Sequence, residues 1–134
     1  KDLLKLKENK SNMRERLILD NHKINQIISS VKKIIKFKNP VDKELASWKR
    51  PNGLVIKRVS IPIGIIGVIY ESRPNVTSDV SALAFKSGNV VILRGGSDAS
   101  HSNRIISNLF RKALKKKNLI KIVFNSLLTK TEKL

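Results

Sequence analysis

Two short polar segments, residues 71–75 and 94–98, hold the side chains of this sequence that are best suited to binding a ligand. Each follows an apolar run, precedes a helical pattern and carries an arginine, and the second adds Gly95 and Gly96. Glycine lets backbone N–H groups approach an anion closely, and a guanidinium supplies charge and a fork of donors. Since strand-to-helix turns of a parallel sheet emerge at one edge, the segments predict a shared mouth for a phosphate-bearing ligand, such as a nucleotide cofactor.

Each of these residues also has a purely structural interpretation. The patterns G-x-G-x-x-G and G-x-x-x-x-G-K-[ST] are both absent, so neither standard nucleotide fingerprint applies. Arg73 could equally pair with Glu71 or a carbonyl, and a plain turn is slightly favoured for the two glycines. Asn75 is expected to cap the next helix more readily than to donate to an oxyanion. The sequence offers no convincing pair of nucleophile and general base.

The composition excludes several classes of site. Without cysteine there is no disulfide, no thiolate nucleophile and no cysteine-based metal site, and His22 and His101 alone do not predict a metal centre. No apolar run approaches the roughly 20 residues that cross a membrane, and no signal peptide is visible. We therefore expect a cytoplasmic protein without metal or membrane contact. Because the sequence begins at Lys1, we also expect that its natural start is missing.

The net charge of +18 has two explanations. Such charge is typical of proteins that bind nucleic acid or another anionic surface. The basic residues are mainly lysines, however, and isoleucine and asparagine are also abundant, as AT-rich codons would produce. Dedicated phosphate-binding proteins tend to favour arginine. Codon bias is the favoured explanation, and a basic nucleic-acid-binding module is the alternative.

Hydrophobic periodicity predicts an α/β chain with N-terminal helices and a strand pair, followed by a Rossmann-like β-α-β-α-β parallel unit. Residues 1–40 form the helical lead-in, with a helix over 21–36 capped by Asp20. Residues 48–53 form a turn and 54–60 a strand. Within the unit at 61–124, strands are expected at 65–70, 90–93 and 120–124, the first buried on both faces. Helices are expected from about 77 to 87, ended by Gly88, and over 99–117.

Three long segments resemble a known family: RPNGL at 50–54, IPIGIIGVIYESRPNVT at 61–77 and KSGNVVILRGGSDASHSN at 86–103. They are similar to gamma-glutamyl phosphate reductase, the glutamate-5-semialdehyde dehydrogenase of proline biosynthesis, a branch of the aldehyde dehydrogenase superfamily. The resemblance covers nearly all of residues 1 to about 120 and becomes loose from Lys121 onward.

The resemblance implies a reductase that uses NADPH to convert gamma-glutamyl phosphate to the semialdehyde. It also implies a homo-oligomer for the full-length parent and places Asn75 near the turn that supplies an oxyanion-binding amide. The residues onto which it carries contact with NADP(H) are Ser72, Arg73, Pro74, Asn75, Arg94, Gly95, Gly96 and Ser97.

The sequence departs from this family in one decisive respect. The family works through a cysteine thiolate that attacks the acyl phosphate, and this chain contains no cysteine. We therefore interpret residues 1–134 as a partial NADP-binding domain without the catalytic domain, and predict that the chain alone is inactive. A third interpretation, beside the reductase and the nucleic-acid-binding module, is a non-catalytic remnant of a decaying gene.

Overall fold

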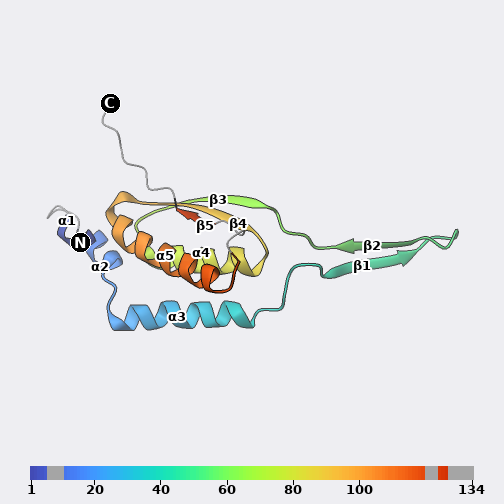
Figure 1. Cartoon of the computed structure of the whole chain (residues 1–134), viewed down its shortest axis with the longest axis horizontal. Helices are drawn as coiled ribbons and strands as arrows, with labels where there is room; N and C mark the ends of the chain where they lie inside the picture. Colours follow the sequence, from blue (N-terminus) through green and yellow to red (C-terminus); the bar gives the residue numbers. More distant parts are fainter. Residues whose placement is uncertain (6–10, 120–123, 127–134) are drawn as a thin grey trace, which may run out of the picture.

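A computed structural model describes residues 1–5, 11–119 and 124–126 (Figure 1). It confirms the α/β class. The helices and strands follow in the order α1 (Asp2–Lys5), α2 (Ser11–Leu17), α3 (Asn21–Lys36), β1 (Glu44–Lys49), β2 (Val55–Val59), β3 (Ile65–Tyr70), α4 (Pro74–Lys86), β4 (Val90–Gly95), the short 3₁₀ turn η1 (Ser97–Ala99), α5 (Ser100–Lys116) and β5 (Phe124–Ser126).

A parallel three-stranded sheet in the order β3-β4-β5 organises the body of the molecule. Its core is built from Val91 and Leu93 on β4, which pack with Ala84 of α4 and Leu114 of α5. Both crossover helices therefore cover the same face of the sheet. Right-handed crossovers give this result whenever the strand order advances in one direction.

The prediction that β3 is buried on both faces is wrong for this reason. Ile65 is 70% exposed and Ile69 is 83% exposed, whereas Ile66, Val68 and Tyr70 on the other side of the strand are partly buried. The continuous apolar run has the composition of a strand that is buried on both faces, but the described helices cover only one face of it.

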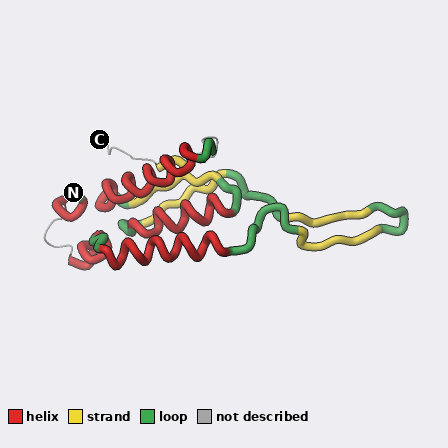
Figure 2. The backbone as a smooth tube through the Cα atoms, turned by 60° about the horizontal axis from the view of Figure 1, so that its bottom comes forward, coloured by secondary structure: helices red, strands yellow, loops and turns green. Residues whose placement is uncertain are grey.

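The contacts between the helices are made by small side chains, although the sequence pattern predicts large apolar residues there. α4 lies between the sheet, α3 and α5, and α3 runs alongside it (Figure 2). The buried residues of α4 include Thr77, Ser78 and Ser81, whose small size lets neighbouring helices approach. Helical spacing predicts that six large apolar residues of these helices face the core, but the structure leaves all six well exposed: Ile24, Ile28, Ile35, Leu83, Ile105 and Leu109.

The ends of the helices follow local chemistry. The Asp20 carboxylate accepts the N–H of Lys23 at 2.7 Å, which confirms the predicted cap of α3. Gly88 has a φ of +68° and, with Asn89, returns two N–H groups to the last turn of α4, as expected for the glycine that ends a helix. The start of α4 differs: the helix begins at Pro74, since proline suits the first helical position.

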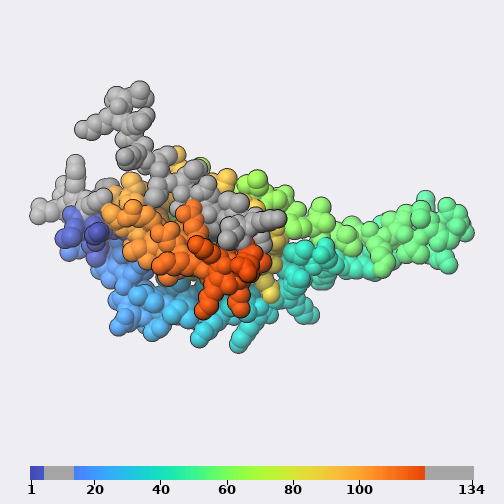
Figure 3. Space-filling model, in the orientation of Figure 1, coloured from blue at the N-terminus to red at the C-terminus, as the bar shows by residue number. Residues whose placement is uncertain are grey.

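A two-stranded antiparallel ribbon, β1 and β2, extends away from the body (Figures 1 and 3). Trp48 lies in β1 rather than in the predicted turn, which is confined to residues 50–53. The third parallel strand is Phe124–Ser126, so it overlaps the predicted 120–124 at one residue, and 120–123 lie outside the described residues. Within the described part of the chain, no helix is long and apolar enough to span a bilayer.

Candidate functional site

The two polar segments lie side by side at the carboxyl edge of the sheet. Tyr70 and Gly95 are register partners at the ends of β3 and β4. The loops that follow them approach so closely that a Cβ on Gly96 would stand 2.5 Å from Ser72 Oγ and 3.1 Å from the Ser72 nitrogen. Gly96 has a φ of −58°, which any residue can adopt, so glycine is needed here for space. The pair Gly95-Gly96 is thus a point of contact between loops and not a plain turn.

A chain of hydrogen bonds among Tyr70, Thr77 and Asn103 links the elements that carry both loops. Thr77 Oγ1 donates to Asn103 Oδ1 at 2.9 Å and lies 2.6 Å from the Tyr70 hydroxyl. Because the single threonine proton is used on Asn103, the Tyr70 hydroxyl must be the donor to Thr77. Burial raises the pKa of Tyr70, which keeps that proton in place.

The network also fixes the end of β4. A Cβ on Gly95 would collide with Asn103 Nδ2 and would lie 2.9 Å from the Tyr70 ring. β3, α4 and α5 are thereby tied together under the Arg94 loop.

The side chains predicted to contact a cofactor fall into two groups. Arg73, Asn75, Arg94 and Ser97 are exposed, so their side chains can reach a ligand at this edge. Ser72 and Pro74 are buried, and their side chains hold the loop in shape. Gly95 and Gly96 are partly buried and offer backbone groups.

Arg73 and Asn75 do not adopt their predicted structural roles. Glu71 pairs with Arg16, at 3.1 Å between Oε2 and Nη1, instead of with Arg73. The residue that precedes α4 is Arg73, and no side chain caps the helix there, so the prediction that Asn75 is the cap is wrong. Asn75 sits one residue inside the helix because Pro74 takes the first position. Both side chains remain available for a ligand.

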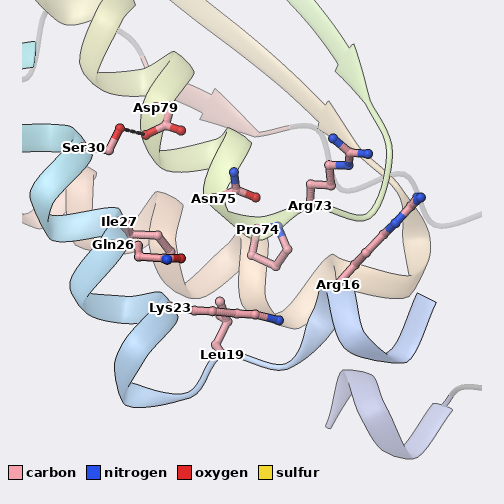
Figure 4. A pocket seen from close by; sticks show the side chains of 10 residues that line it. All are labelled: Arg16, Leu19, Lys23, Gln26, Ile27, Ser30, Arg73, Pro74, Asn75 and Asp79. Atoms are coloured by element: carbon pink, nitrogen blue, oxygen red, sulfur yellow. Dashed lines mark hydrogen bonds between the residues drawn. The ribbon is translucent and has the colours of Figure 1, made fainter. Parts of the chain in front are cut away.

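A cavity of about 410 Å³ opens beside the first loop, between the α2–α3 region and the start of α4 (Figure 4). Figure 4 shows α3 on one side and the first turns of α4 on the other. The lining residues are Arg16, Leu19, Lys23, Gln26, Ile27, Ser30, Arg73, Pro74, Asn75 and Asp79. The cavity therefore shares Arg73, Pro74 and Asn75 with the predicted site.

Three cations and one carboxylate line this cavity. The carboxylate, Asp79, accepts a hydrogen bond of 2.7 Å from Ser30 Oγ, and the Lys23 ammonium donates to the Glu15 carbonyl oxygen. Arg16 is held by Glu71, but the two side chains are 43% and 73% exposed. A solvated pair of this kind contributes only about 0.2–1 kcal/mol, so another anion can compete for Arg16.

The sequence interpretation missed the α2–α3 side of the cavity. Lys23, Gln26, Ile27 and Ser30 recur at helical spacing and so share one stripe of α3. Helical periodicity alone would have grouped them, although nothing in it shows that α4 lies opposite. The described residues contain no group of histidine, cysteine, aspartate or glutamate side chains that could hold a metal ion.

Comparison with known proteins confirms the resemblance inferred from the sequence motifs. No family model matches the chain. The gamma-glutamyl phosphate reductase of a Sulfurovum species is 49% identical over 107 residues, which are 80% of this chain and 26% of that protein. The enzyme of the same name from Aliarcobacter butzleri is 46% identical over 121 residues, 89% of this chain and 29% of that protein.

Solved structures of the same family have the same fold as this chain. The crystal structure of gamma-glutamyl phosphate reductase from Thermotoga maritima matches with a TM-score of 0.89 and 43% identity, over 94% of this chain and 31% of that one. The enzyme from Saccharomyces cerevisiae matches with a TM-score of 0.84 and 25% identity, over 97% and 35% of the two chains. The chain thus spans about a quarter to a third of these relatives and corresponds to their N-terminal part.

Proposed function

We propose that this chain is the N-terminal, cofactor-binding part of a gamma-glutamyl phosphate reductase, an oxidoreductase of proline biosynthesis. The identity of 49% over 107 residues with a relative of that name is the observation that carries the proposal. The juxtaposition of residues 71–75 and 94–98 at one sheet edge supports it, because these loops lie in the motifs on which the resemblance rests.

The edge of the sheet fits the phosphate-bearing part of NADPH. Arg94 and Arg73 are exposed there, and the glycine pair lets the chain backbone pass close by. We assign Arg94 and Ser97 to the adenosine ribose and its phosphate, and Arg73 to the same mouth. NADPH, when bound, supplies the hydride; the residues of this chain bind and orient it.

Asn75 is the residue of this chain that we place at the reacting carbonyl. It lies in the first turn of α4, lines the cavity and is exposed, so its amide can donate to an oxygen that gains negative charge. The thioester chemistry needs a cysteine, and the 134 residues contain none. We therefore expect the chain by itself to bind cofactor without turnover.

The test is NADPH binding by the 134-residue chain, measured by nucleotide fluorescence at fixed salt. Arg94→Gln is expected to weaken binding by about tenfold, since a charge-assisted hydrogen bond is lost. Arg58→Gln, on the β2 ribbon, removes the same charge and should leave binding unchanged. Equal affinities of the two variants would refute the proposed cofactor site, and detectable reduction of gamma-glutamyl phosphate by the purified chain would refute its expected inactivity.

The basic nucleic-acid-binding module stays an alternative prediction with its own test. A DNA titration at several salt concentrations separates it from the reductase. Binding that survives about 0.15 M salt with a steep salt slope would favour the alternative.

A further inference from the structure

We infer that the outer face of α5 is a docking surface for an acidic amphipathic helix of another protein. Ile105 and Leu109 receive the apolar residues of that helix, and Arg104, Lys112 and Lys116 pair with its carboxylates. None of these residues is among those assigned to the cofactor, so the inference goes beyond the proposed function and does not depend on it.

The outer face of α5 has an apolar part that is open to solvent. Ile105 is 61% exposed, and Leu109, one turn later, is 60% exposed. The exposed Lys112 and Lys116 continue the same stripe at spacings of three and four residues. On the opposite side of the helix, Asn103 is buried and bonded to α4. The stripe therefore faces away from the sheet, and Figure 3 shows α5, in orange, on the near face of the molecule.

Positive charge is concentrated on the helices that cover the sheet. Four cationic side chains lie on α3, one on α4 and five on α5, whereas Asp79 is the only acidic residue within these three described helices. Its carboxylate already accepts a hydrogen bond from Ser30. In the rest of the sequence, cationic residues outnumber acidic ones only twofold. Codon bias acts on the whole sequence, so it does not explain this concentration.

Part of the positive charge on α5 has a structural explanation. Lys115 and Lys116 lie in the last turn, where cations stabilise a helix through its dipole. Arg104 and Lys112 lie outside that turn, so the dipole does not account for them. Neither has an acidic partner on its own helix, because α5 contains no aspartate or glutamate. These two cations are therefore the best suited to pair with a partner protein.

The combination of aliphatic and cationic side chains indicates the class of partner. A second copy of the chain that met this face with its own α5 would bring the same positive charge to the contact. Binding of single-stranded nucleic acid uses aromatic side chains for base stacking, and the exposed apolar side chains here, Ile105 and Leu109, are aliphatic. A helix with an apolar stripe flanked by carboxylates matches both the spacing of these two residues and the charge around them.

The experiment measures the fluorescence anisotropy of a labelled amphipathic peptide of about 18 residues, made of glutamate, alanine and leucine, with its leucines on one face of a helix. We expect this peptide to bind the 134-residue chain at about 0.15 M salt. A scrambled peptide of the same composition, with its leucines on all sides, should bind about tenfold more weakly. Leu109→Gln, which keeps a good helix former, should weaken binding of the amphipathic peptide about tenfold, and Lys112→Gln about threefold.

The matched controls are Leu45→Gln and Lys49→Gln, at exposed residues of the same types on β1. Both should bind the amphipathic peptide as the native chain does. Urea unfolding checks that Leu109→Gln is folded, and Ile105→Gln is a second variant of the same stripe. Arg94→Gln, which tests the cofactor site, should leave peptide binding unchanged, so that either proposal can fail without the other.

Three results would overturn the inference: no binding of the amphipathic peptide to the native chain at this salt, equal binding of the amphipathic and scrambled peptides, or equal effects of Leu109→Gln and Leu45→Gln. An oligothymidylate and a phosphatidylserine vesicle are titrated on the same samples. If either of them bound with the Leu109 dependence and the amphipathic peptide did not, the surface would belong to nucleic acid or to a bilayer, and the inference would be wrong.

Discussion

At the scale of single residues, Gly96 shows that a position selected for its chemistry is also constrained by packing. The glycine pair was identified as a feature that lets the backbone approach a phosphate. In the structure, the space that a Cβ of Gly96 would need is occupied by Ser72, a residue of the other loop. The same glycine thus sets the distance between the two loops, on which any shared ligand site depends.

Replacement of Gly96 by alanine is expected to destabilise the chain by about 1–3 kcal/mol and to weaken NADPH binding, because a Cβ 3.1 Å from the Ser72 nitrogen forces the loops apart. Gly67→Ala is the control, since a Cβ there, on the open sheet face, would meet no atom within 4 Å apart from those of the neighbouring residues in the chain. It should change the free energy of unfolding by less than about 1 kcal/mol. Urea unfolding of both variants measures the difference, and equal effects would contradict the role given to Gly96.

The Tyr70–Thr77–Asn103 chain predicts a specific pattern of coupling. Thr77→Val keeps the shape of the side chain but leaves the Tyr70 hydroxyl and Asn103 Oδ1 without their partner, at an expected cost of about 1–3 kcal/mol. Tyr70→Phe added to Thr77→Val removes one of the stranded groups. The double variant should therefore be more stable than the sum of the single effects predicts. Strict additivity in urea unfolding would show that the hydroxyls do not form one network.

At the scale of elements, the first residues of the chain hold the start of α5. The Asp2 carboxylate accepts the N–H groups of His101 and Ser102 at 3.0 and 2.7 Å and the Ser102 hydroxyl at 2.6 Å. Burial pushes the pKa of Asp2 upward, but these hydrogen bonds outweigh it and leave the pKa below its ordinary value of 3.8. A cap provided from about a hundred residues away joins α1 to α5.

Asp2→Asn is expected to lower the free energy of unfolding by about 1 kcal/mol at neutral pH, as loss of a helix cap does. Because the folded pKa is depressed, the stabilisation is complete above the unfolded pKa and is lost as the pH falls through the folded value. The difference between the native chain and Asp2→Asn should therefore be constant at neutral pH and shrink below about pH 4. Asp42→Asn, at an exposed position with a φ of 56° that asparagine tolerates, is the control. A difference that grows in acid would contradict the assignment.

The elements also show what a sequence can and cannot predict. The extent of α3 and its Asp20 cap, and the Gly88 end of α4, were predictable because short-range hydrogen bonds determine them. A strand pair was expected, but only its second strand, at 54–60, was given bounds, because the predicted turn at 48–53 includes Trp48 and Lys49 at the end of β1. The loop residues of the candidate site came from strand-to-helix patterns, whereas Arg16 and Lys23 come from helices that only the packing of α3 on α4 brings to the same place.

At the scale of the whole molecule, the sheet has one covered and one open face. The apolar run of β3 predicts a strand with helices packed on both of its faces. The described helices pack on one face only, because β3, β4 and β5 follow each other across the sheet in a single direction. Ile65 and Ile69 are left on the open face. The matched relatives are about three times as long as this chain. Exposed isoleucines on a sheet face favour contact with any apolar surface, including a second copy of this chain.

Ile69→Lys is therefore expected to reduce self-association of the purified chain without loss of stability. Ile69 is 83% exposed, so a lysine there has no buried contacts to replace, and its charge opposes the stacking of two open faces. Sedimentation velocity over a range of concentrations measures the association, and urea unfolding measures the stability. Trp48→Lys, at an exposed aromatic on the ribbon, tests the other apolar surface with a similar change of charge. If Trp48→Lys abolished association and Ile69→Lys left it unchanged, the ribbon and not the open sheet face would be the surface through which copies of the chain meet.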